Sequence, residues 1–237
     1  MRTDNAQEVT PSRSSSGDVA AFLKQARGIG AANPGARGRL ILGLDATMSR
    51  QPTWDLACSL QAEMFEAVDK SAQLNVQLVY FRGFRECRAS KFVADTASLS
   101  NLMIRIDCRA GHTQIGKVLS HALKETAKEK VHALVYIGDA MEESIDDLAH
   151  KAGELGLRGV PVFVFQEGHD RVAEQAFREV AKLTRGAWFR FDRSSPATLG
   201  RLLSSIAVYA SGGFKALEQR GRSEDRLLIE NMKGGRS

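Results

Sequence analysis

The hydrophobic and polar positions of the chain alternate between short apolar runs and longer amphipathic stretches. Residues 40–44, 131–137 and 161–165 are nearly continuous apolar runs, which is the pattern of strands buried on both faces. Between them, apolar residues recur with the spacing of one helix face, as in residues 52–68 and 171–185. This alternation is typical of a mainly parallel sheet that is covered by helices.

Further segments complete the predicted sheet. Residues 75–81 and 86–92 predict two strands joined by a tight turn at Gly83, so one antiparallel strand is expected at an edge. Residues 186–191 predict the last strand, and further helices are expected at 96–105, from the Thr113 loop to about 128, at 144–155 and from Pro196. We therefore expect a Rossmann-like α/β fold: a doubly wound, mainly parallel six-stranded sheet with helices on both faces.

Composition divides the 237 residues into three parts. Residues 1–37 are rich in Ser, Gly, Ala and Asn and predict a flexible leader that contains one short helix capped by Asp18. Residues 38–213 are expected to form the domain, and residues 214–237 a charged C-terminal tail. The net charge of +5 comes from the two ends, because residues 40–213 hold basic and acidic residues in equal number.

The apolar segments and the cysteines of the sequence indicate the cellular compartment. No stretch reaches the roughly 18 uninterrupted apolar residues of a membrane-spanning helix, and the N-terminus has no apolar signal-peptide core. Cys58, Cys87 and Cys108 are an odd number of cysteines in a chain too long to need disulfides, which favours a reducing compartment. We therefore expect a cytoplasmic protein with no membrane partner.

Asp45, Thr47 and Ser49 follow the first apolar run at alternate positions. One carboxylate and two hydroxyls suit Mg²⁺ or Mn²⁺, which are hard cations that prefer oxygen ligands and retain water. The same residue types also cap helices and shape turns, so the motif alone leaves both interpretations open.

Two later residues extend the candidate metal site. Thr113 opens a predicted helix, and Asp139 follows the apolar run 131–137. The carboxyl ends of parallel strands meet at one edge of a sheet, where ligands bind near the switch in strand order. We therefore expect Asp45, Thr113 and Asp139 to converge at that edge.

These three pieces, in this order, resemble the metal-ion-dependent adhesion site of von Willebrand factor A domains. The family pattern is Asp-x-Ser-x-Ser, then Gly-Gly-Thr-x-x-Gly, then an Asp after the fourth strand. Thr47 keeps the hydroxyl of the family's Ser, whereas His112 replaces a Gly and Ala140 follows Asp139 where Gly is common. The last two changes alter loop geometry, so a metal-competent site and a degenerate, structural one both stay open. The resemblance implies the metal ligands Asp45, Thr47, Ser49, Thr113 and Asp139.

The resemblance also implies a function. It implies a non-enzymatic module whose metal ion keeps one coordination position open for an Asp or Glu of a protein partner. The chain is similar to uncharacterised bacterial intracellular single-domain members of the family, which implies a partner such as an ATPase or chaperone component. The expected rim of that contact is formed by Arg82, Phe84, Arg85, His112 and His169.

Three other functions are compatible with parts of the sequence. Basic and aromatic residues around Phe84 suit single-stranded nucleic acid, but here they are typical of a hairpin turn with a charged edge strand, which argues against it. A metal-dependent hydrolase or phosphatase would use Asp45 as nucleophile, as haloacid-dehalogenase-like phosphatases do. Such enzymes need an acid two residues later, where this chain has Thr47. A metal-free structural scaffold is the third alternative.

Overall fold

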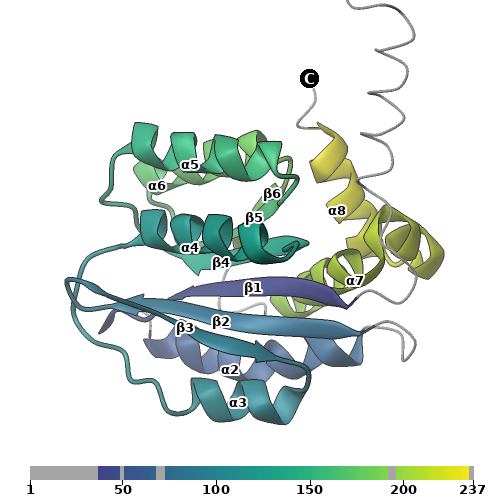
Figure 1. Ribbon diagram of the computed structural model, residues 1–237, viewed down its shortest axis with the longest axis horizontal. Coiled ribbons are helices and arrows are strands. Elements are labelled where there is room, and N and C mark those ends of the chain that lie inside the picture. The colour runs from purple at the N-terminus through teal and green to yellow at the C-terminus, as the bar shows by residue number, and fades with distance from the viewer. Residues whose placement is uncertain (1–36, 49–50, 68–72, 192–195, 235–237) are drawn as a thin grey trace, which may run out of the picture. The chain divides into compact units, whose positions relative to one another are not determined.

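The computed structural model describes residues 37–48, 51–67, 73–191 and 196–234 (Figure 1). The short helix predicted in the leader lies outside the described residues, and so does Ser49 of the expected metal ligands. Element labels follow Figure 1.

One six-stranded sheet forms the centre of the fold, with the strand order β3-β2-β1-β4-β5-β6. The strands are β1 (Gly38–Asp45), β2 (Leu74–Arg82), β3 (Glu86–Val93), β4 (Ala133–Gly138), β5 (Val162–Glu167) and β6 (Ala187–Phe191). Neighbouring strands are parallel except for β3, which runs antiparallel to β2 at one edge. The predicted fold class is confirmed.

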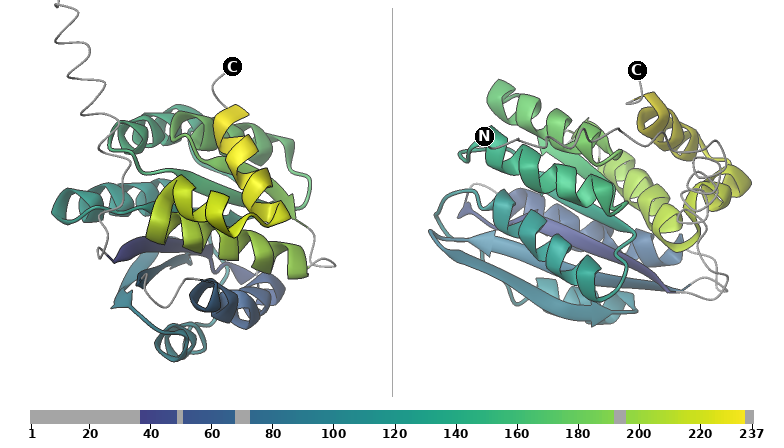
Figure 2. Two further views of the ribbon diagram at one scale, coloured as in Figure 1. Left: turned by 90° about the vertical axis from the view of Figure 1, so that its right-hand side faces the viewer. Right: turned by 45° about the horizontal axis from the view of Figure 1, so that its top comes forward.

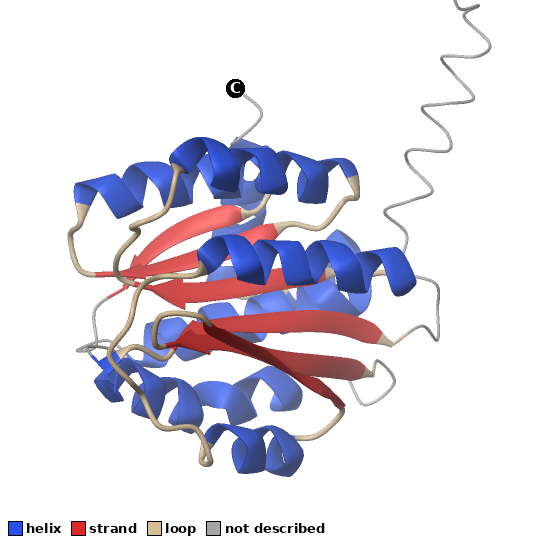
Figure 3. Cartoon of the chain, turned by 60° about the vertical axis from the view of Figure 1, so that its left-hand side comes forward, coloured by secondary structure: helices blue, strands red, loops and turns tan. Residues whose placement is uncertain are grey.

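Helices cover both faces of the sheet (Figures 1 and 3). They are α2 (Gln51–Glu66), α3 (Thr96–Met103), α4 (Ile115–Lys128), α5 (Ile145–Leu157), α6 (Arg171–Leu183), α7 (Pro196–Arg220) and α8 (Ser223–Gly234). Leu40, Leu42 and Leu44 of β1 join the apolar cluster of α2, α3, α7 and α8, whereas Ile41 joins the cluster of α4, α5 and α6. Because both faces are covered, β1 is apolar at nearly every position. Within the described residues, no helix has the length and apolar character needed to cross a membrane.

The charged segment after residue 213 is folded rather than a tail. Residues 214–234 form the end of α7 and all of α8, which lies against α7 (Figure 2). The helix α7 is broken at Gly213, whose φ of 67° is left-handed, so the expected domain end coincides with a kink. The segment packs with the domain because apolar residues recur at helical spacing among its charges; those buried are Leu217, Leu228 and Met232.

Candidate metal-binding edge

Asp45 and Asp139 come from the two central strands of the sheet. The chain leaves β1 toward β2 and β3 and returns on the other side of β1 as β4, so the strand order switches between β1 and β4. Leu44 of β1 pairs with Ile137 of β4, which places Asp45 and Asp139 at the carboxyl edge of adjacent strands. This is the position at which open α/β sheets bind ligands.

The loop after β1 is ordered by the Asp45 carboxylate. Its Oδ1 accepts the backbone N–H of Thr47 at 2.8 Å, which is the bond of an Asx turn. Asp45 and Thr47 are buried, with 4% and 8% of their surfaces exposed. The N–H of Arg109 donates to the carbonyl of Ala46 at 3.0 Å, which brings the segment before Thr113 alongside this loop.

Thr113 is joined to the loop after Asp139 by two reciprocal hydrogen bonds. The Thr113 N–H donates to Glu142 Oε2 at 3.1 Å, and the Glu142 N–H donates to Thr113 Oγ1 at 3.0 Å. We call this pair of bonds the Thr113–Glu142 clasp. His112 Nδ1 lies 3.0 Å from the same carboxylate oxygen of Glu142. The clasp fixes the position of the Thr113 hydroxyl relative to the loop after β4, which contains Asp139.

Glu143 extends this connection to the start of α4. Its carboxylate accepts the N–H of Gly116 at 2.9 Å and the N–H of Ile115, two donors at the helix N-terminus that have no carbonyl partner within α4. Burial raises the pKa of the Glu143 carboxyl above its ordinary value, while the two N–H donors act in the opposite direction. From the sequence, Glu142 and Glu143, two acids shortly after β4, suit either a more negative potential around a cation or a solvated first helical turn. Their bonds to Thr113 and to the start of α4 could not be predicted, because those partners lie 27 to 29 residues away.

The loop after β5, which was expected to emerge at the same edge as Asp45, brings a further carboxylate there. Gln166 of β5 pairs with Gly138 of β4, so Glu167 lies at the end of β5 next to the end of β4. Glu167 accepts a hydrogen bond from the buried hydroxyl of Thr53, in the first turn of α2. This bond connects the β5 end to the helix that follows the Asp45 loop.

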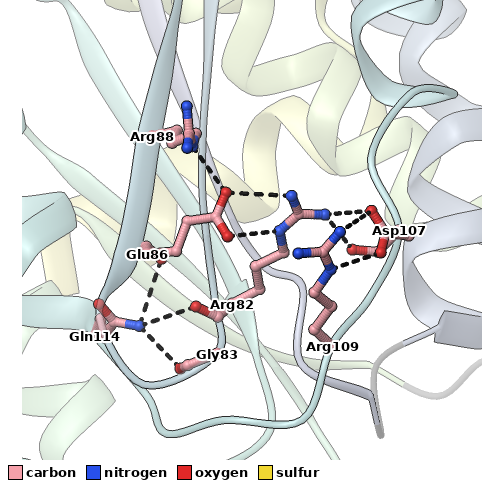
Figure 4. A network of polar contacts seen from close by, with 7 residues as sticks. All are labelled: Arg82, Gly83, Glu86, Arg88, Asp107, Arg109 and Gln114. Carbon is pink, nitrogen blue, oxygen red and sulfur yellow. Dashed lines mark hydrogen bonds and ion pairs between the residues drawn. The ribbon is translucent and has the colours of Figure 1, made fainter.

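Arg82, expected at the rim of a partner contact, is engaged within the chain (Figure 4). Its Nε lies 3.0 Å from Glu86 Oε2. Its Nη1 donates to the carboxylate of Asp107 and also, at 2.8 Å, to the backbone carbonyl of Asp107. The side chain is only 11% exposed, and the hydrogen bond to Glu86 is the main cause that raises its pKa. Arg82 therefore holds the base of the β2–β3 turn to the segment before Thr113.

Three other expected rim residues gather on the surface. Phe84 is exposed at the tip of the β2–β3 turn, and its ring meets the ring of His112 edge-on, with 5.2 Å between centroids. Arg85, the next residue in the turn, is also exposed. His169 is exposed in the loop after β5, and no hydrogen bond or ion pair to a described residue joins it to the other three.

The ligand types at this edge fit a hard divalent cation. Carboxylates from Asp45 and Asp139, with the hydroxyls of Thr47 and Thr113, form an all-oxygen set that suits Mg²⁺ or Mn²⁺. No group of three or more His, Cys, Asp or Glu side chains within the described ranges is arranged to hold a metal ion. A metal ion at this edge would therefore depend on the hydroxyls and on water as well as on two carboxylates.

No family model and no curated protein matches the sequence. Among solved structures, the chain is similar to a von Willebrand factor type A protein from Catenulispora acidiphila, with a TM-score of 0.61 and 15% identity, over 74% of this chain and 43% of that one. It is also similar to proximal thread matrix protein 1 from the mussel byssus, in a structure whose metal-ion-dependent adhesion site motif is occupied by zinc. There the TM-score is 0.59 and the identity 14%, over 74% of this chain and 46% of that one.

The VWA domain of SpRpn10 is matched over nearly its whole length. The TM-score is 0.51 and the identity 10%, over 69% of this chain and 95% of that domain. By contrast, the chain spans less than half the length of the first two proteins. At these identities the likeness concerns the fold, and it agrees with the resemblance found in the sequence. The chain has the fold of von Willebrand factor A domains.

Proposed function

We propose that this chain is a metal-dependent protein-binding module. Its ligands for Mg²⁺ or Mn²⁺ are Asp45, Thr47, Ser49, Thr113 and Asp139. The observation that carries the proposal is the Thr113–Glu142 clasp, because it joins Thr113 to the loop that follows Asp139, near the edge where Asp45 ends β1. The zinc-occupied motif of the mussel protein, which has the same fold, supports it.

The mode of binding follows from the ligand types. When bound, the metal ion would offer an open coordination position to a carboxylate oxygen of a partner. Hydroxyl ligands are neutral, so Thr47 and Thr113 would neutralise less of the metal's charge than carboxylates in their places. The partner would therefore present an exposed Asp or Glu.

The module is proposed to bind rather than to catalyse. Thr47 stands where an aspartate-based phosphatase needs its second acid, and a hydroxyl cannot protonate a leaving group at neutral pH. We place the protein in a bacterial cytoplasmic complex, with an ATPase or chaperone component as the partner class; this part rests on the family resemblance.

Metal binding is tested by thermal unfolding and titration calorimetry. With free Mg²⁺ at about 100 times its dissociation constant, the folded state should gain about 2.7 kcal/mol. Asp45→Ala should abolish the gain and Thr113→Ala should reduce it, because each removes a ligand oxygen. Asp146→Ala, which removes an exposed carboxylate from α5, is the matched control and should respond like the wild type. A wild type that neither Mg²⁺ nor Mn²⁺ stabilises at millimolar concentration would contradict the proposal.

A further inference from the structure

The turn Gly83–Arg85 presents one aromatic side chain to solvent. Phe84 is 72% exposed, in a fold that otherwise buries most of its large apolar residues. The other face of the turn packs closely against the loop that contains Gly111. Gly83 itself has a left-handed φ of 59°. A Cβ at Gly111 would lie 2.0 Å from the Gly83 carbonyl oxygen, so only glycine fits there.

The turn is also fixed by hydrogen bonds from the start of α4. The Gly83 carbonyl accepts the His112 N–H at 3.2 Å and Gln114 Nε2 at 3.2 Å. Lys117 Nζ donates to the Arg85 carbonyl at 3.0 Å. With Arg82 anchored to Asp107 (Figure 4), the turn is bound on both sides, so the backbone of Phe84 is held in place. An exposed aromatic residue that is rigidly held loses little conformational entropy on binding, which is a property of interface hot spots.

The surroundings of Phe84 are positively charged. Arg85 and Lys117 are exposed at the turn. The acids near it are already engaged: Glu86 with Arg82 and Arg88, and Glu142 with His112 and the Thr113 N–H. The guanidinium of Arg85 makes no ion pair with any residue that the structure describes. This surface therefore complements an acidic partner.

The Phe84 turn is also close to the metal-binding edge along the sheet. Phe81, three residues before Phe84, pairs with Asp45. His112 touches the Phe84 ring and is the residue before Thr113. A single partner segment can thus reach both the metal ligands and Phe84.

We propose that Phe84, Arg85 and His112 form a second contact for the same partner, which carries an apolar side chain and an acidic side chain beside its metal-binding acid. This inference rests on the proposed function for the metal-binding acid. Phe84 and His112 pack against the apolar side chain, and Arg85 pairs with the additional acid. The partner is a protein segment rather than a nucleic acid, because one edge-packed ring offers no platform for successive bases.

Selection from a displayed library of random twelve-residue peptides tests the proposal; it is carried out on the full chain in Mg²⁺. Enriched peptides should share an acidic residue and an aromatic or large aliphatic residue, with a further acid. Phe84→Ser should weaken their binding about tenfold or more, and Arg85→Glu should weaken it as well. Leu157→Ser is the matched control, because Leu157 is 92% exposed at the far end of α5 and its loss should leave binding unchanged.

The two proposals can fail separately in this experiment. Peptides that require Mg²⁺ and Asp45 but bind Phe84→Ser as tightly as wild type would overturn the second contact and keep the metal function. Peptides lost in Phe84→Ser but retained in EDTA and in Asp45→Ala would keep the contact and overturn the metal function. No enrichment, or Phe84-dependent binding of a single-stranded oligonucleotide in place of acidic peptides, would overturn the second contact.

Discussion

Among single residues, Glu142 has the most direct effect on the Thr113 hydroxyl. Glu142→Ala removes the carboxylate that accepts the Thr113 N–H and the contact with His112, while the Glu142 backbone N–H remains. Groups that orient metal ligands typically matter about 10- to 100-fold in affinity, so we expect a loss of that order for Mg²⁺. Titration calorimetry measures it, and the melting temperature in EDTA should stay near that of wild type because the side chain is exposed. Unchanged metal affinity would mean that the Glu142 carboxylate does not orient Thr113.

Arg82 and Arg85 differ in role although they are three residues apart. Arg82 is buried in the network with Glu86 and Asp107, whereas Arg85 projects into solvent. We expect Arg82→Ala to lower the free energy of unfolding by about 1 kcal/mol or more, since packing and hydrogen bonds are lost together. Arg85→Ala should change it by less than about 0.5 kcal/mol. Urea denaturation distinguishes them, and equal effects of the two substitutions would contradict this assignment.

The two arginines also show what a sequence can reveal about single residues. The basic and aromatic composition of 82–85 correctly indicated a hairpin turn with charged flanks. It could not show that Arg82 turns inward, because its partner Asp107 lies 25 residues away and belongs to a loop with no periodic pattern. Asp45, Thr113 and Asp139 were easier to predict, since each directly follows a strand or opens a helix whose pattern is regular.

At the level of whole elements, α8 is held to α7 by a buried ion pair. Asp225 is fully buried, with its carboxylate bonded to Arg220 Nε at 2.9 Å and to the Arg222 N–H at 3.0 Å. Arg220 also donates to the hydroxyls of Ser204 and Ser205 in α7. Burial acts to raise the pKa of Asp225, but the hydrogen bond with Arg220 and its other partners lower it overall. Asp225 therefore stays charged at neutral pH.

Removing one partner of this pair leaves a buried charge without its counterion. We expect Asp225→Ala to lower the free energy of unfolding by about 3 kcal/mol. Glu230→Ala, on the exposed side of α8, should have little effect and is the control. Chemical denaturation measures both. A small effect of Asp225→Ala would show that α8 contributes little to the stability of the domain.

The strands and most helices were predictable because burial on both faces leaves an unmistakable apolar pattern. The segment 214–234 was not, because charged residues outnumber the few apolar ones that carry its helical spacing. Its packing also involves Arg220 and Asp225, a pair that local composition suggests is surface charge. A buried ion pair and a solvated one look the same in a sequence.

For the molecule as a whole, two histidines predict how stability depends on pH. His132 Nδ1 accepts the Arg39 N–H at 3.1 Å, and His121 Nε2 lies 2.9 Å from Gln77 Oε1. Burial lowers the pKa of both rings below the ordinary 6.5. The unfolded chain thus binds protons at these rings more readily than the folded chain, so the free energy of unfolding should fall as the pH drops below 6.5.

The expected slope is at most about 1.4 kcal/mol per pH unit for each histidine. Urea denaturation at about pH 7.5 and about pH 5.5 measures it. His132→Asn keeps an acceptor for Arg39 but cannot be protonated, so it should reduce the pH dependence. Carboxylates with a lowered pKa act at lower pH: the pKa of Asp107, for example, is lowered to about 2, chiefly by its hydrogen bond with Arg109. Equal stability of the wild type at both pH values would contradict the prediction.

The switch in strand order between β1 and β4 has a consequence for the molecule as an assembly of two halves. Residues 38–128 carry Asp45, Thr47 and Thr113 on β1, its loop and the start of α4, while residues 133–234 carry Asp139. Within the described chain, each half therefore contains only part of the proposed set of metal ligands, and the boundary between the halves passes through the proposed site. If the chain were cut between α4 and β4, a bound metal ion would hold the two fragments together. Metal would then raise the affinity of the fragments for each other, and their association would raise the affinity for metal by the same factor.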